Sequence, residues 1–216
     1  MMGSNGGGGG GRAGGAGRPG RVSGGGGGAA FGKRDETNIQ LYAGNGDYVL
    51  YNKLAMEGRA AVNAEANRVA RLAGDKGMSA EARKEWNRIQ RNLPRIDKSL
   101  AKLPNYEGTT YRILNWGAYE KSMMHEFAAK HKVGSTVTYK GFTSTSKIKT
   151  SPYFDYSKPK ARTVRIKFQS KRGKDVSKYS RAPEEAEVTF GRNTKFRVTG
   201  KKQRSDGGWD ITVSEI

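Results

Sequence analysis

The apolar residues of this chain follow a helical period first and a strand period afterwards, and this order constrains the fold more than any other feature. From Asp47 to about Leu103, apolar side chains recur at steps of three and four residues. We therefore expect two amphipathic helices, separated by a turn at 72–78. The two apolar faces consist of Tyr48, Tyr51, Leu54, Ala55, Gly58 and Val62, and of Trp86, Ile89, Leu93, Ile96, Leu100 and Leu103.

The second helix carries signals for its start and for an interruption. Ser79 is expected to cap its N-terminus, because a serine side chain accepts a hydrogen bond from an unpaired N–H of the first turn. Glu81 then lies in the first turn, where a negative charge is favourable. Pro94 lacks a backbone N–H, so we expect it to kink or split this helix.

Beyond Gly108 the sequence takes on the alternation and the β-branched content of strands. One further helix is expected at 117–132. The expected strands are 109–114, 135–146, 161–168, 185–190, 194–200 and 209–216. Helices followed by strands, without βαβ alternation, predict an α+β fold with a helical part at about 45–103 and a β-rich core at about 108–216.

Residues 1–34 form a glycine-rich segment of different character. It has too few apolar residues to offset the entropy lost on ordering, so we expect a disordered, weakly basic tail or linker before a single domain at 35–216. A tether is the favoured role. Binding of nucleic acid or membrane through Arg12, Arg18 and Arg21 is the alternative.

The charge of the chain favours anionic partners. Its 40 Lys and Arg residues against 20 Asp and Glu give a formal net charge of +20, which favours nucleic acid, an acidic membrane surface or a phosphate-rich ligand. With no cysteine and only two histidines, no metal site is expected. No apolar run is long enough to span a bilayer, and we find no secretory signal peptide.

Three short strings contain candidate functional residues. Arg112 lies inside the apolar strand "YRIL", where a rigid guanidinium can grip a phosphate or ribose, although a solvent-facing arginine is the ordinary alternative. The string "GFTSTS" supplies the hydroxyls of Ser144, Thr145 and Ser146, which are individually weak evidence. Glu185 and Glu187 are two apart, so on a strand they would share one face. Like charges this close favour a nearby cation, and a solvated acidic patch is the alternative.

In this order, the three strings resemble the mono-ADP-ribosyltransferases of the Arg–Ser–Glu class, which include the enzymatic components of clostridial binary toxins. The resemblance covers roughly residues 45–216. It is carried by "IDKSLAKLPNYEGTTYR", "HKVGSTVTYKGFTSTS" and "KDVSKYSRAPEEAEVTFGRNTKFRV". It implies a helical layer packed on a mixed, mostly antiparallel two-sheet core, with a cleft for NAD⁺ as the substrate. Relatives often have glycine after the first-strand arginine, where this chain has Ile113.

The resemblance also implies a role for each matched residue. Arg112 would bind the phosphates or ribose of NAD⁺, and Ser144 would orient Glu187. Glu187 would stabilise the oxocarbenium-like transition state, as in glycoside hydrolysis. Glu185 matches the position that activates the acceptor, and glutamate there is associated with arginine acceptors. Thr145 and Ser146 would line the nicotinamide pocket.

In such enzymes the loop 147–160 covers the substrate, which suggests further contacts. We expect Phe154 to stack on nicotinamide, with Tyr153 and Tyr156 as alternatives, or all three to be surface packing. Lys158 and Lys160 either meet the diphosphate or are solvated. Tyr179 is expected to face the acceptor.

The expected function is therefore transfer of ADP-ribose to arginine in target proteins by a monomeric toxin or effector. It would be exported without a signal peptide, would act in the cytoplasm, and could have an immunity protein as a partner. Three alternatives stay open: a basic nucleic-acid-binding module, ADP-ribosylation of nucleic acid or of proteins bound to it, and hydrolysis of NAD⁺ with water as the acceptor.

Overall fold

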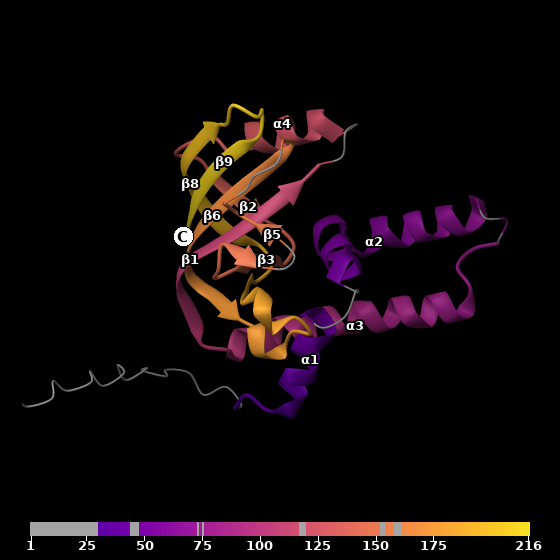
Figure 1. Cartoon of the computed structure of the whole chain (residues 1–216). Helices are drawn as coiled ribbons and strands as arrows, with labels where there is room; N and C mark the ends of the chain where they lie inside the picture. Colours follow the sequence, from indigo (N-terminus) through magenta and orange to yellow (C-terminus); the bar gives the residue numbers. More distant parts are fainter. Residues whose placement is uncertain are drawn as a thin grey trace, which may run out of the picture.

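The computed structural model describes residues 30–43, 48–72, 74, 76–116, 120–151, 154–157 and 161–216. Most of the expected tail at 1–34 lies outside this range. Helices precede the sheet and strands dominate the rest (Figure 1), so the α+β prediction is confirmed. The helices are α1 (Lys33–Ala43), α2 (Tyr48–Leu72), α3 (Ala80–Lys102) and α4 (Lys121–Lys130). The strands are β1 (Asn105–Asn115), β2 (Thr136–Tyr139), β3 (Thr143–Ser146), β4 (Thr150–Ser151), β5 (Phe154–Asp155), β6 (Thr163–Asp175), β7 (Glu187–Phe190), β8 (Thr194–Gln203) and β9 (Trp209–Glu215).

Helix α1 was not expected from the sequence, and it begins two residues inside the segment predicted to be a tail. Asp35 in its first turn accepts a hydrogen bond from the backbone N–H of Gly32 at 3.0 Å. The same carboxylate accepts one from Ser99 at 2.9 Å and pairs with Lys102 at 2.9 Å. Both partners belong to α3, so the short helix is held by tertiary contacts that its own sequence does not reveal.

The split expected at Pro94 does not occur. Helix α3 runs through Pro94 as one helix, and the neighbouring Leu93 and Ile96 are anchored in the core. The interruption lies in α2 at Gly58, whose φ of 81° is a conformation that side-chain-bearing residues rarely adopt. The Ser79 cap is confirmed, since its side chain accepts a hydrogen bond from the N–H of Ala82 at 3.1 Å.

The strands form two connected parts. Strand β6 pairs with β1 along its length and with β9, and β8 and β2 extend this part to the order β1-β6-β9-β8-β2. Strands β3 and β7 form the second part, joined to the first where Tyr111 pairs with Ser146 and Lys174 pairs with Thr189. Only β6 and β9 are parallel in this sheet, so the prediction of a mixed, mostly antiparallel core is confirmed. A separate pair, β4–β5, follows β3.

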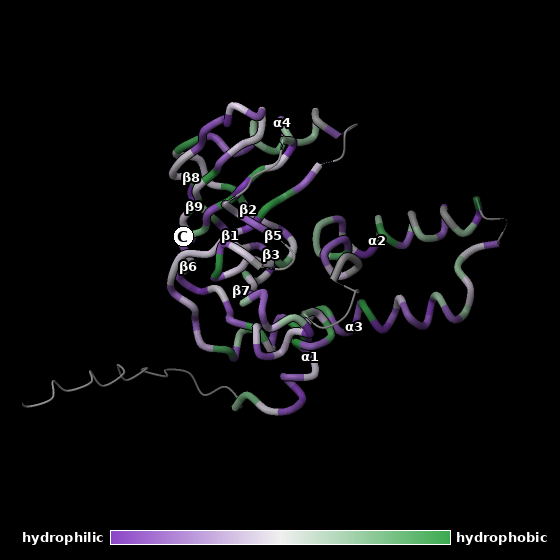
Figure 2. Tube along the Cα trace, viewed as in Figure 1, coloured by the Kyte–Doolittle hydropathy of each residue, from purple (hydrophilic) through white to green (hydrophobic). Residues whose placement is uncertain are grey.

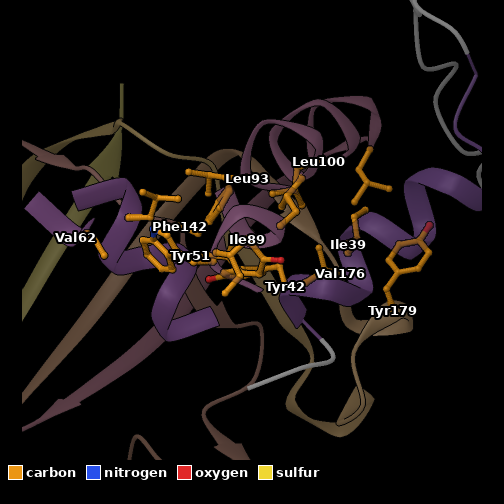
Figure 3. Packing of buried hydrophobic residues seen from close by; sticks show 14 residues of the cluster. Ile39, Tyr42, Tyr51, Val62, Ile89, Leu93, Leu100, Phe142, Val176 and Tyr179 are labelled. Atoms are coloured by element: carbon orange, nitrogen blue, oxygen red, sulfur yellow. The ribbon is translucent and has the colours of Figure 1, made fainter. Parts of the chain in front are cut away.

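Two hydrophobic clusters hold these layers together. The first joins α1, α2 and α3 to Phe142, Val176 and Tyr179 from the connections around the sheet (Figure 3). The second lies between α4 and the sheet, with Met124 packed among Ile166, Phe168 and other strand residues. The helical layer therefore lies against the edge of the sheet that carries β3 and β7. None of the helices in the described part combines the length and apolarity that crossing a bilayer requires.

Candidate active site

A cleft of about 440 Å³ opens where β1, β3 and the start of β7 meet the end of α1. The four residues predicted to be catalytic all line it, although up to 75 positions separate them in the sequence (Arg112 to Glu187). A volume of this size is typical of ligand pockets. The predicted residues are thus brought together at one concave surface.

Arg112 reaches the cleft from the middle of β1. Its neighbours on the strand pair with β6, which fixes the backbone on one side. The guanidinium is half-buried and donates a hydrogen bond from Nη1 to the backbone oxygen of Ser144 at 3.2 Å. A guanidinium has five N–H donors, so further donors are compatible with binding of an anion. Ile113, which stands where relatives often have glycine, also lines the cleft.

The three hydroxyls of β3 have different partners. Ser144 hydrogen-bonds the carboxylate of Glu187. Thr145 donates to the backbone oxygen of Val188 at 2.7 Å, and Ser146 donates to that of Glu185 at 2.7 Å. All three line the cleft, but Thr145 and Ser146 use their hydroxyls to hold the backbone around β7.

Glu187 begins strand β7 and is 8% exposed. Thr189, two residues along the same strand, donates to its Oε1 at 2.8 Å. Burial raises the pKa of the Glu187 carboxyl, while hydrogen bonds from Ser144 and Thr189 and the charge of Arg112 act in the opposite direction. The site thus holds a carboxylate in one orientation in a poorly solvated position, where its charge acts strongly on a nearby cation.

Glu185 lines the cleft from a different structural element than the strand that was predicted for it. It ends a 3₁₀ helix, η3 (Pro183–Glu185), and does not share a strand with Glu187. Ala186 between them has φ 50°, a left-handed conformation that costs about 1–2 kcal/mol for a residue other than glycine. Burial, followed by the charges of Glu187 and Glu184, raises the pKa of Glu185. The two carboxyls share a cleft because the backbone turns sharply at Ala186, not because of strand alternation.

Tyr42 is a cleft residue that the sequence analysis missed. It comes from α1, is 2% exposed, and its hydroxyl lies 3.0 Å from that of Ser144. Burial raises the pKa of Tyr42 to about 12, so the phenol is protonated at neutral pH. An ionised carboxylate only accepts hydrogen bonds, so Ser144 donates to Glu187 and Tyr42 donates to Ser144. The spacing of Ile39 and Tyr42 was the available signal for a buried helix here.

Aromatic rings flank the cleft on the side of β1. Tyr111 lines it and packs on Tyr156, with ring centroids 4.8 Å apart. Lys149 lies over the Tyr111 ring, and Arg165 lies over the Tyr156 ring. The predictions for Tyr153, Lys158 and Lys160, and for the side chain of Phe154, fall outside the described residues.

Tyr179, which we expected to face the acceptor, is not among the residues that line the cleft. It is 6% exposed and packs against Phe31, with ring centroids 5.5 Å apart. The segment that carries it turns inward because Val176 and Tyr179 both belong to the helical cluster (Figure 3). Its apolar ring gains more from this core than from a solvated position at the mouth of the cleft.

The cleft thus combines a cation suited to phosphate, a buried and oriented carboxylate, and a second carboxyl with a raised pKa. Such a set can bind a nucleotide, stabilise positive charge on a sugar, and accept a proton. This set of residues, in an α+β fold with a helical layer beside the cleft, is typical of the enzymes that transfer ADP-ribose.

Comparison with known proteins assigns the family. Residues 65–215 match the model of the ADP-ribosyltransferase exoenzyme family. The chain belongs to this family.

The relatives are distant. A putative NAD(+)--arginine ADP-ribosyltransferase Mav of Mycobacterium avium (strain 104) is 32% identical over 112 residues, which are 52% of this chain and 12% of the length of that protein. The solved ADP-ribosyltransferase Vis, crystallised with agmatine, has a TM-score of 0.60 at 18% identity, covering 86% of this chain and 75% of Vis. The type III effector XopAI of Xanthomonas axonopodis pv. citri has a TM-score of 0.57 at 19% identity, covering 84% of this chain and 66% of XopAI. The two structures share the fold.

Proposed function

We propose that this chain is a mono-ADP-ribosyltransferase that modifies arginine side chains of target proteins, with Arg112, Ser144, Glu185 and Glu187 as its catalytic set. The observation that carries the proposal is that both carboxyls line the same cleft as Arg112 and Ser144. Membership of an enzyme family makes a purely nucleic-acid-binding module the less favoured alternative.

In the first step, the bond between ribose C1′ and the nicotinamide nitrogen breaks, and its electron pair leaves with nicotinamide. The sugar becomes oxocarbenium-like, and a carboxylate beside it stabilises the transition state more than the substrate. Glu187 suits this role because it is buried and oriented by Ser144 and Thr189. Arg112 holds the phosphates or ribose of the substrate. Phe154 is the proposed stacking partner of nicotinamide.

In the second step, a guanidinium nitrogen of the acceptor bonds to C1′ and loses one proton. Glu185 is suited to pair with the guanidinium and to accept that proton, because burial and neighbouring negative charge raise its pKa. Two carboxyls at one cleft also provide the negative charge that a guanidinium needs. Arginine as acceptor agrees with the name of the Mycobacterium relative and with agmatine, which ends in a guanidinium, in the Vis crystals.

The proposal is tested with labelled NAD⁺ and agmatine as a small acceptor. Glu187→Ala is expected to lower both nicotinamide release and transfer by at least about 100-fold, the scale of losing one transition-state contact. Glu185→Gln is expected to abolish transfer while NAD⁺ hydrolysis continues. The exposed Glu57→Ala on α2 serves as the matched control and is expected to leave both unchanged.

Two outcomes would contradict this assignment. Equal loss of transfer and hydrolysis in Glu185→Gln means that Glu185 does not select the acceptor. Nicotinamide release without any labelled acceptor, in both agmatine and lysate reactions, means that water is the acceptor.

We also propose that the enzyme acts as a toxin or effector in the cytoplasm of a target cell. XopAI, which shares the fold, is described as a type III effector. Expression inside a cell is expected to arrest growth, and Glu187→Ala is expected to relieve the arrest at an equal protein level. Arrest that persists with the inactive variant would assign the toxicity to something other than transfer.

A further inference from the structure

Helices α2 and α3 run side by side and project away from the sheet (Figure 1). Between and beside them lie three adjoining hollows of about 340, 380 and 240 Å³. Asn87 lines all three, and Arg59, Arg83 and Arg91 each line two. We call the surface formed by these four residues the hairpin surface. It shares no lining residue with the NAD⁺ cleft as described.

The charged residues that line the hairpin surface are all basic in the described part of the chain. None of the described residues that line its hollows is acidic. Arg59, Arg83 and Arg91 are exposed, and within the described part of the chain they form no ion pair with a carboxylate. Some other described arginines do pair with carboxylates, among them Arg88 with Glu85 and Arg192 with Asp97. The guanidinium groups of Arg59, Arg83 and Arg91 are available to an external anion.

The cations are arranged in a row. Arg83, Asn87 and Arg91 are four residues apart on α3, so they share one face at steps of about 6 Å. Arg59 adds a fourth polar group from α2, and Lys84 lines the first hollow beside them. Figure 2 shows the hydrophilic colour along this projecting half of α3. A row of this kind matches a linear polyanion better than a single compact anion.

The chemistry of the surface favours nucleic acid among polyanions. Arginine forks bind phosphate in two places, and asparagine and glutamine side chains are regular donors to phosphate and sugar. Three more amides, those of Asn63, Asn67 and Gln90, line the same hollows. A membrane-binding helix needs exposed apolar side chains to insert. Met56 and Leu72 of α2 are exposed but line none of the three hollows, and Trp86, which lines one of them, is buried and bonded to Asn63.

We propose that the hairpin surface binds nucleic acid through the phosphate backbone, independently of sequence and of NAD⁺ chemistry. The enzyme is thereby held at nucleic acid or at complexes that contain it.

The test measures binding of the full chain to fluorescent 20-base-pair duplexes of DNA and RNA between 50 and 200 mM salt, about the range in which phosphate contacts lose most affinity. The triple variant R59Q/R83Q/R91Q is expected to bind at least about tenfold more weakly. Its log–log salt slope is expected to fall by about 2 to 3, since each phosphate contact contributes about 0.9. Glutamine is a good helix former, which limits the effect on folding.

A matched control separates this surface from net charge. The triple variant K132Q/K171Q/K202Q removes the same charge from exposed lysines at the sheet, and its affinity is expected to change less than about threefold. R59K/R83K/R91K keeps the charge and is expected to keep most of the salt slope. Thermal unfolding and NAD⁺ hydrolysis are measured for every variant, and both are expected to match the parent chain.

Three results would overturn the proposal. The first is equal weakening by the two glutamine triples, which reduces binding to net charge. The second is affinity for the duplexes that does not depend on salt. The third is binding of polyglutamate, or of vesicles containing phosphatidylserine, as tightly as the duplexes, which identifies an acidic protein or a membrane as the partner.

Discussion

The hydroxyl of Tyr42 lies 3.0 Å from the hydroxyl of Ser144, across 102 positions of sequence. Since Ser144 also hydrogen-bonds Glu187, helix α1 is linked to the proposed catalytic carboxylate through one serine. The helical layer thus helps to orient the site and does more than cover it.

Tyr42→Phe removes the hydrogen bond to Ser144, together with the one between Asn52 and the same hydroxyl. We expect kcat for nicotinamide release to fall about threefold to tenfold, corresponding to roughly 0.5–1.5 kcal/mol for one hydrogen bond, with KM for NAD⁺ little changed. Tyr51→Phe is the control, because Tyr51 is also buried but its hydroxyl accepts from Asn92 in the helical core. It is expected to lower stability without changing kcat. Equal effects of Tyr42→Phe and Tyr51→Phe on kcat would contradict the proposal that Tyr42 orients the site.

Activity should depend on the ionisation of Glu187. Burial raises the pKa of this carboxyl above its usual 4.5, so nicotinamide release is expected to fall as pH drops through that raised value. Thr189→Val removes a hydrogen bond that lowers the pKa, so the acid limb of the pH–rate profile should move to higher pH. Thr199→Val on β8 is the control and should leave the limb in place. An unmoved limb in Thr189→Val would assign it to another group.

Glu184 should affect the pKa of Glu185, and so the transfer step, without affecting the release of nicotinamide. Its charge contributes to the raised pKa of Glu185, so Glu184→Gln is expected to lower that pKa. The acid limb of transfer to agmatine should then move to lower pH, while the acid limb of NAD⁺ hydrolysis stays in place. A shift of both limbs by the same amount would argue against separate roles for the two carboxyls.

His131 should make stability depend on pH. It is 3% exposed, with Nδ1 2.7 Å from the backbone oxygen of Phe127 and Nε2 2.9 Å from the Tyr139 hydroxyl. Burial lowers its pKa below 6.5, so the unfolded chain binds the proton more tightly than the folded one. The stabilisation is present above pH 6.5 and is lost as pH falls through the lowered pKa, with a slope of at most about 1.4 kcal/mol per pH unit.

Urea unfolding at pH 7.5 and 5.5 measures this dependence. His131→Gln should be less stable at pH 7.5 and should lose less stability on acidification than the parent chain. If both chains lose the same amount, acid sensitivity comes from other groups.

The interruption of α2 should require glycine. Gly58→Ala forces a side chain into φ 81° and ψ 165°, a region that essentially only glycine adopts, and we expect a loss of about 1–3 kcal/mol in the free energy of unfolding. Gly191→Ala is the control, because an added Cβ there meets open space and no positive φ is needed. A neutral Gly58→Ala would mean that α2 continues as a straight helix in solution.

The order of helices and strands, the Ser79 cap and the residue types of the cleft could be predicted from the sequence alone, because they depend on local periodicity, on one capping side chain and on short motifs. The rest depended on contacts between distant segments. Helix α1 is held by Ser99 and Lys102 of α3, and Tyr42 meets Ser144 only after the chain has folded. Core packing keeps α3 continuous at Pro94, and the left-handed turn at Ala186 sets the relation of Glu185 to Glu187. Local propensity is worth a few tenths to about 1 kcal/mol per residue, and burial of one large side chain outweighs it, so tertiary structure decided these features.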